Sequence, residues 1–364
     1  MRTRTVVAIL AAVLLMGLAS FGALAPAAGA QSSSADAGRR LVSVTGQSTT
    51  RPGLLVDVIL AVPAGRNVEQ AAADALRAQG ARPVTAAYLG SDGFTLNNVS
   101  WPGPTTQYYN PTGQEVSNGE SLLTDAQLAW TAVADSTFEV TTAGTTTRCP
   151  SLVKECPGRQ VTDDTNDVGW LRLKGSSNVL GVAWSVTSGP EVDIALNTAA
   201  AGWDQDDLTL GVLLHEEGHF GGLGHSGDSG AVMYRYIADP PLAALTADDA
   251  EGITYLYPTK TLDVEGKVTT DGTNAIAGAT VQLVGTPYSA TTGANGTYTL
   301  RSVPAPVTYD IRASGDGVVT TYRDQISSGH TTFDFILAPT EQDSGGPSHC
   351  SNPANANHPS CRKR

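Results

Sequence analysis

Residues 215–225 read His-Glu-Glu-Gly-His-Phe-Gly-Gly-Leu-Gly-His, and this spacing constrains the fold more than any other part of the chain. On a helix, His215 and His219 project from one face about a turn apart, so both imidazoles can share one metal ion. A straight helix would carry a residue ten positions past His215 about 15 Å further along its axis. Gly222 has no Cβ, so it can adopt positive φ, end the helix and reverse the chain. The segment therefore predicts a helix that ends near Gly222 and a turn that returns His225 to the same ion.

Glu216 is rotated about 100° from His215 on that helix, beside the metal, where its carboxylate can take a proton from water. Three neutral imidazoles and a water make the open site of a catalytic zinc, whereas a structural zinc is usually closed and rich in cysteine. The pattern H-E-x-x-H-x-x-G-x-x-H thus predicts one catalytic Zn²⁺, with His215, His219 and His225 as ligands and Glu216 as the acid–base residue. The alternative is that these are ordinary core or surface histidines, but three of the six histidines occupy the three ligand positions.

A methionine follows the zinc motif at a short distance, in the run Ala231-Val232-Met233-Tyr234. Here the chain resembles the metzincin metallopeptidases, whose long zinc motif is followed by a methionine turn beneath the metal. Ser226, directly after the third histidine, and Tyr234, directly after Met233, are similar to the matrixin branch. The resemblance extends over residues 94–258. It implies an α+β catalytic domain, built from a twisted mixed sheet with an active-site helix and a C-terminal helix, and a protein or peptide substrate.

Residues 179–187 alternate into an apolar strand that resembles the family strand bordering the active-site cleft. The edge of such a strand offers unpaired N–H and C=O groups, to which an extended peptide can add as another strand. We therefore expect Leu180, Ala183 and Tyr234 to contact the substrate.

The cap signals place the two helices around this site. Asp204 or Asp206 is a candidate N-cap for the active-site helix. Thr246-Ala247-Asp248-Asp249 predicts a capping-box start for a last helix, which Pro258 stops.

Residues 162–170 resemble the family's turn into a strand and contain three aspartates. Their carboxylates could hold Ca²⁺, or they could simply be solvated.

The N-terminal residues 1–30 are predicted to be a secretory signal peptide, because Arg2 and Arg4 precede an apolar run that ends in the small residues Ala28-Gly29-Ala30. A retained membrane anchor is the alternative. No second hydrophobic segment follows, so we expect a secreted, extracellular protein without a membrane partner. Without its leader the chain has 20 basic and 35 acidic residues. This balance disfavours nucleic acid as a partner and leaves the oligomeric state open.

Residues 31–93 predict a small β-α-β unit, with an extended run at 54–62 and a helix at 68–79. It is either a prosegment that assists folding or blocks the cleft, or a permanent subdomain. Animal matrixins use a prosegment cysteine as a latch, and upstream histidines for a second zinc. Here the first cysteine is Cys149 and no histidine precedes His215. We therefore expect neither the thiol latch nor the second zinc, so any inhibition must be steric or use another ligand.

Residues 262–338 change to short alternating strands with glycine turns, which predicts a small all-β sandwich. Within it, residues 291–303 resemble the carboxypeptidase-regulatory-like, transthyretin-like module. Residues 339–364 are polar and predict a flexible tail. The four cysteines form two local pairs, which predicts disulfides in an exported chain, although other pairings are possible. The predicted pairs are Cys149 with Cys156 and Cys350 with Cys361.

These features together predict a secreted zinc endopeptidase in which Glu216 activates water. The first alternative is an exopeptidase or amidase that acts on cell-wall peptides with the same zinc chemistry. The second is a non-catalytic extracellular protein that binds its partner through the β-sandwich.

Overall fold

The computed structural model describes residues 39–84, 93–152, 162–173, 178–187, 191–203, 205–238, 240–315 and 317–338. The predicted signal peptide and the predicted tail lie outside these ranges, as do Asp204 and the cysteines at positions 156, 350 and 361. Among the described residues, no helix combines the length and apolar character needed to cross a bilayer.

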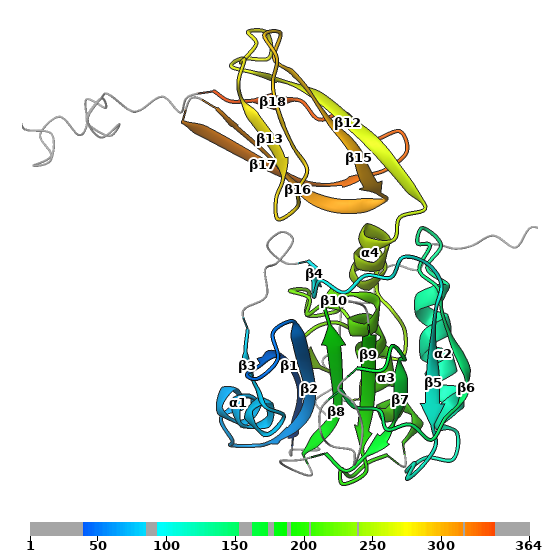
Figure 1. Cartoon of the computed structure of the whole chain (residues 1–364). Helices are drawn as coiled ribbons and strands as arrows, with labels where there is room; N and C mark the ends of the chain where they lie inside the picture. Colours follow the sequence, from blue (N-terminus) through cyan, green and yellow to red (C-terminus); the bar gives the residue numbers. More distant parts are fainter. Residues whose placement is uncertain are drawn as a thin grey trace, which may run out of the picture. The chain divides into compact units, whose positions relative to one another are not determined.

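One large sheet joins the N-terminal residues to the region that carries the zinc motif (Figure 1). Within the described residues it has nine strands in the order β11-β1-β2-β8-β9-β7-β5-β6, with β3 paired to β1. The strands are β1 (Arg39–Ser48), β2 (Leu54–Pro63), β3 (Ala81–Pro83), β5 (Thr105–Asn110), β6 (Val140–Thr145), β7 (Asp167–Leu171), β8 (Val179–Val186), β9 (Glu191–Asn197) and β11 (Tyr236–Ile237). The predicted β-α-β unit is therefore continuous with the sheet of the predicted catalytic domain, and β1 adds a strand that the sequence did not predict.

Strands β2, β8 and β9 are buried on both faces, which fits their nearly continuous apolar sequences. On one face, Val58 and Leu60 of β2 pack with Leu76 of helix α1 (Val68–Ala78). On the other face, Ile59 belongs to the same core as Val212 of helix α3 (Asp206–Gly221). Helix α2 (Gly119–Thr131) packs against α3. The alternation along β2 consequently directs every second side chain toward α3.

The sequence predicts the N-terminal cap of one helix correctly and that of another wrongly. Helix α4 (Ala247–Leu256) begins at Thr246 with the predicted capping box to Asp249. At the start of α3 the N-cap residue is Gln205, and no side chain caps it. The prediction of Asp206 was wrong, because Asp206 lies inside the first turn and accepts a hydrogen bond from Asn118 instead.

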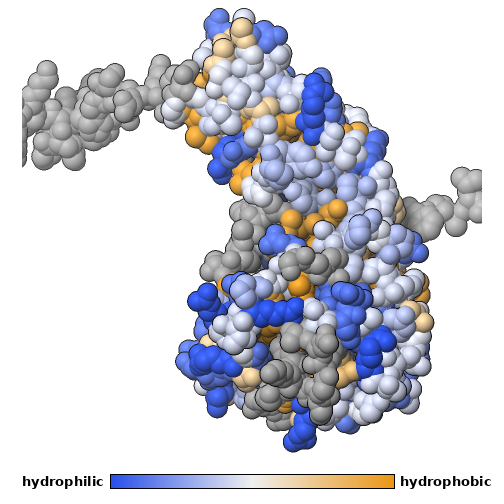
Figure 2. Space-filling model, in the orientation of Figure 1, coloured by the Kyte–Doolittle hydropathy of each residue, from blue (hydrophilic) through white to orange (hydrophobic). Residues whose placement is uncertain are grey.

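The C-terminal part forms the predicted β-sandwich, with sheets β15-β12-β18 and β14-β13-β16-β17. Its strands are β12 (Lys260–Thr269), β13 (Thr280–Leu283), β14 (Ser289–Thr291), β15 (Thr297–Ala305), β16 (Val307–Gly315), β17 (Val318–Ile326) and β18 (Phe335–Ile336). Val264, Ile311 and Phe335 are among its buried core residues. Figure 2 shows hydrophobic residues on the surface of this part, and Val319, Tyr322 and Ile336 are its exposed large apolar side chains. Single exposed apolar residues are common and assign no function.

Candidate metal centre

Helix α3 and the turn after it bring the three histidines of the motif together. Gly222 has φ 106°, and a Cβ there would lie 2.3 Å from the carbonyl oxygen of Val99. The predicted chain reversal is thus confirmed, and only glycine fits at this position. The turn continues into β10 (Leu223–Gly224), which pairs with β4 (Thr95–Leu96). The Thr95 hydroxyl donates to the carbonyl oxygen of His225 at 2.8 Å and fixes the returning segment.

Each imidazole is oriented through its Nδ1 atom, so that Nε2 points into a common space. Nδ1 of His215 lies 2.8 Å from the Val232 carbonyl oxygen, and Nδ1 of His219 lies 2.8 Å from that of Leu223. The three Nε2 atoms are buried and make no hydrogen bond. Burial lowers the pKa of His215 well below its ordinary value and that of His225 to about 4. Burial also acts to lower the pKa of His219, but the carboxylate of Asp57 in β2 raises it above the ordinary value. Three imidazoles whose Nε2 atoms converge without hydrogen bonds are a donor set that fits zinc.

A fourth side chain, Asp57 of β2, completes this cluster. Its carboxylate and the three histidines offer ligand atoms that all lie within 4.8 Å of one another. Asp57 Oδ2 lies 3.3 Å from Nε2 of His219 and 3.4 Å from Nε2 of His225. Burial alone would raise the pKa of Asp57, but the charges of His219 and His225 hold it well below the ordinary value. Among the described residues, this is the group of His, Cys, Asp and Glu side chains that can hold a metal ion.

The sequence analysis did not identify Asp57. The residue stands within the apolar run 54–62, where it is the only charged side chain. A buried charge in such a strand needs a partner, and this was the signal that could have identified it. The sequence analysis expected water as the fourth partner of the three histidines, whereas the structure places the Asp57 carboxylate beside them.

Glu216 and Glu217 are both fully buried beside the histidines. Neither carboxylate oxygen of Glu216 makes a hydrogen bond, and burial raises its pKa well above the ordinary value. Gly181 of β8 lies against it, since a Cβ on Gly181 would be 3.4 Å from Glu216 Oε1. Burial raises the pKa of Glu217 to about 8, although Gln107 donates a hydrogen bond to it at 2.9 Å. Glu217 thus has a hydrogen-bond partner, whereas the carboxylate of Glu216 has none, and its role in proton transfer stays a prediction.

Met233 lies in a turn directly beneath α3. The side chain is fully buried, and a Cβ on Gly218 would come 2.2 Å from its sulfur atom. The Asp249 carboxylate accepts hydrogen bonds from the backbone N–H groups of Val232 at 2.9 Å and Met233 at 3.0 Å. Because the Val232 carbonyl accepts from His215, α4 supports the position of the His215 ring through this turn. Met233 thus lies buried in a turn against α3, and its role beneath a bound metal stays a prediction.

The predicted substrate contacts lie in different environments. Leu180 and Ala183 of β8 are both 1 % exposed, because the edge of β8 is already paired with β2. The prediction that this edge is open was therefore wrong. Tyr234 is half-buried and packs on Tyr236 with ring centroids 5.7 Å apart.

The acidic turn at 162–170 does not bring its three aspartates to a common site. Asp167 is buried and pairs with Arg148 at 2.8 Å. The Asp163 carboxylate accepts from Thr165, while Asp164 is exposed. Calcium binding at this turn therefore gains no support from the arrangement and stays a hypothesis.

Cys149 is not a free thiol. Its predicted partner Cys156, like Cys350 and Cys361, lies outside the described residues. Both disulfide pairings therefore stay predictions.

The α+β fold, the three converging histidines and the methionine turn define a metzincin-like protein. Residues 158–258 match the matrixin family, and residues 263–338 match the carboxypeptidase regulatory-like domain. The chain thus contains a matrixin domain followed by a carboxypeptidase regulatory-like domain.

Two known proteins are similar to parts of the chain. Metalloendoproteinase 1 of Glycine max is 28 % identical over 181 residues, which cover 45 % of this chain and 54 % of that protein. The chain therefore spans about half the length of this curated relative. The crystal structure of metalloproteinase-II from Bacteroides fragilis matches 60 % of this chain and 77 % of its own, with 14 % identity and a TM-score of 0.28. A likeness this slight carries no argument.

Proposed function

We propose that the chain is a secreted zinc endopeptidase. The observation that carries this proposal is the convergence of three buried Nε2 atoms, free of hydrogen bonds, beside the equally unpartnered carboxylate of Glu216. His215, His219 and His225 would hold the zinc. When bound, the ion would lower the pKa of a water molecule and polarise the scissile carbonyl.

Glu216 performs the proton transfers in this proposal. Its carboxylate takes the proton of the attacking water and later passes it to the leaving amine. Its burial raises its pKa, and a raised pKa suits the second step, because the group keeps the proton until the amine accepts it. General acid–base catalysis of this kind typically contributes about 10²- to 10⁴-fold in rate.

Strand β8 would align the substrate in this proposal only after β2, which pairs with its edge in this structure, has left it. β8 extends from Val179 to Val186, so a peptide added in the place of β2 would be held by its backbone on both sides of the cut. This favours cleavage within a chain over removal of a terminal residue. Secretion is proposed from the leader-like sequence of residues 1–30.

A digest of casein with the purified, zinc-loaded full chain tests the function. We expect internal fragments by mass spectrometry, and we expect a zinc chelator to abolish them. The control variant Glu216→Gln should retain stoichiometric zinc and lose at least 99 % of the activity, in line with the magnitude above. Release of terminal residues alone would identify an exopeptidase instead. Substantial turnover by Glu216→Gln would refute the role of Glu216.

A further inference from the structure

Strand β2 occupies the place beside β8 that the proposed function assigns to a substrate. The two strands pair antiparallel from Leu54 opposite Val186 to Leu60 opposite Val179. In this register Asp57 lies opposite Ala183, and its side chain lies on the face toward α3 and the histidines. The N-terminal part of the chain therefore covers the strand edge and the metal centre with a single strand.

The distances around Asp57 match a shared metal ion better than a hydrogen bond. Two ligands about 2.0–2.1 Å from a tetrahedral zinc lie about 3.3 Å apart. Asp57 Oδ2 lies 3.3 Å and 3.4 Å from Nε2 of His219 and His225. A charge-assisted hydrogen bond would be about 2.7–2.9 Å long, and neither Nε2 atom makes one in this structure.

Strand β1 fixes the Asp57 carboxylate in this position. The Ser43 hydroxyl donates to Oδ1, and the Thr45 hydroxyl donates to Oδ2 at 2.6 Å. Thr45 Oγ1 also lies 3.4 Å from Nδ1 of His225. Ligating carboxylates are usually oriented by hydrogen bonds of this kind. Residues 39–84 therefore supply both a ligand and the groups that orient it.

We propose that Asp57 is the fourth ligand of the zinc, and that residues 39–84 hold the peptidase latent until β2 leaves β8. The proposal rests on the proposed function and adds its regulation. A zinc with four protein ligands has no position left for water, which is the arrangement of a structural site. Glu216 can act as the acid–base residue only if a water molecule can occupy the fourth position of the zinc. The N-terminal unit is therefore a removable prosegment and not a permanent subdomain.

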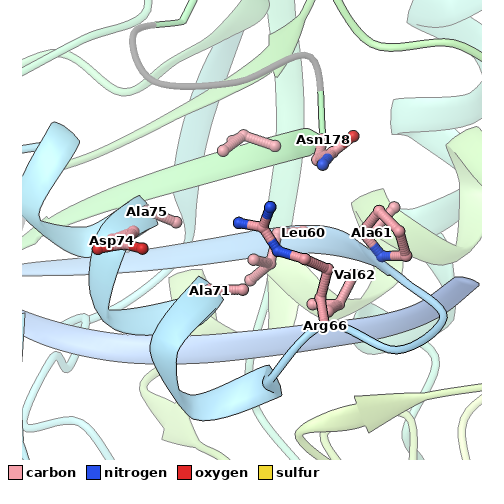
Figure 3. Close-up of a pocket in the computed structure, with 10 residues that line it drawn as sticks. Leu60, Ala61, Val62, Arg66, Ala71, Asp74, Ala75 and Asn178 are labelled. Atoms are coloured by element: carbon pink, nitrogen blue, oxygen red, sulfur yellow. The ribbon is translucent and has the colours of Figure 1, made fainter.

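The pairing between β2 and β8 is irregular at one end. The register shifts between Ile59 and Leu60, and next to this shift lies a cavity of about 110 Å³ on the face opposite the histidines. Figure 3 shows Leu60 and Val62 of β2, Ala75 of α1 and Asn178 around it. Atoms that line a cavity lack contact partners on one side.

Cobalt substitution tests the ligand assignment without measuring activity. Co²⁺ in the full chain reports its ligands through its visible absorption. We expect Asp57→Ala to change this spectrum, and we expect added acetate to restore it by taking the place of the carboxylate. Azide should bind the cobalt of Asp57→Ala at least tenfold more tightly than that of the wild type.

The matched control is Asp74→Ala, which removes an exposed aspartate of the same N-terminal unit. Its spectrum should equal that of the wild type, with no response to acetate. Asp57→Asn keeps the size of the side chain, so it provides the same test if the alanine variant does not fold. If both Asp57 variants show the wild-type spectrum, or if neither changes the affinity for azide, the ligand assignment is wrong.

The time course of casein digestion tests latency. The zinc-loaded wild type should show a lag that ends as its own N-terminal residues are lost, and Asp57→Ala should shorten this lag at least tenfold. Equal lags in the two proteins would overturn the proposed latch. If the cobalt spectra respond as expected but no variant ever cleaves casein, the proposed function fails while the ligand assignment stands.

Discussion

Asp249 is expected to couple the stability of the methionine turn to the affinity for zinc. Its carboxylate accepts hydrogen bonds from the N–H groups of Val232 and Met233 at 2.9 and 3.0 Å, and from the N–H and hydroxyl of Thr246 at 2.9 and 2.8 Å. Oδ1 accepts only the hydrogen bond from Met233, and Oδ2 accepts the other three. The change Asp249→Asn can keep an oxygen at the Oδ2 position only by turning its NH₂ group toward the N–H of Met233.

This geometry sets the magnitude of each change. Asp249→Asn loses one charge-assisted hydrogen bond and places two donors face to face, so it should cost about 1.5–3 kcal/mol of the free energy of unfolding. Asp249→Ala leaves several buried N–H groups without an acceptor, and we expect about 3–5 kcal/mol. A displaced Val232 carbonyl would also release Nδ1 of His215. Loss of such support around a metal ligand typically costs about 10- to 100-fold in metal affinity.

The assay combines urea unfolding of the zinc-loaded full chain with a zinc competition titration against a chromophoric chelator. The control is Asp207→Asn, an exposed aspartate in the first turn of α3. This control removes a carboxylate near a helix N-terminus and touches no metal ligand. If Asp249→Asn and Asp207→Asn have the same stability and zinc affinity, the coupling through the methionine turn is refuted.

Two further predictions concern Glu217 and Gly222. The pKa of Glu217 is raised from 4.5 to about 8, so its contribution to stability is fully present below pH 4.5 and is lost as the pH rises to about 8. Glu217→Gln should remove this pH dependence. Between the two pKa values, the free energy of unfolding of the variant should rise relative to that of the wild type by about 1.4 kcal/mol per pH unit. Parallel pH profiles of the two proteins would contradict this prediction. Gly222→Ala should cost more than about 1–3 kcal/mol and weaken zinc binding, because φ is 106° and its Cβ would lie 2.3 Å from Val99 O. The control Gly230→Ala, whose Cβ meets only Asp228 Oδ1 at 3.4 Å, should match the wild type in both measurements.

The parts of the site that lie close together in sequence were predictable. The spacing of His215, His219 and His225 determines a helix and a reversal, since only a glycine with positive φ connects them within a few residues. The capping box at Thr246 follows in the same way from its own side chain and that of Asp249. Such features depend on local backbone geometry, which residues close together in the sequence determine.

The start of α3 shows where local signals fail. Two aspartates near the expected N-terminus suggested a side-chain cap, yet the helix begins after Gln205 without one. Asp206 interacts with Asn118 across 88 residues of sequence instead. A tertiary contact decided the role of this residue, and no pattern around it in the sequence indicated that contact.

The strand that pairs with β8 was the least predictable feature, and it brings Asp57 to the histidines. An apolar strand such as β8 can pair with a substrate or with any other extended segment, because backbone hydrogen bonds do not distinguish between them. Only the Asp57 charge in β2 distinguishes this segment, since burial of a carboxylate in an apolar strand requires compensation. The histidines provide it, 158 to 168 residues later in the chain. In the proposed latent form, the contact that compensates the buried charge of Asp57 in β2 also occupies the position that water would need for hydrolysis. If this proposal holds, the interaction that helps the N-terminal unit to fold is the one that inhibits the metal centre, and activation requires its loss.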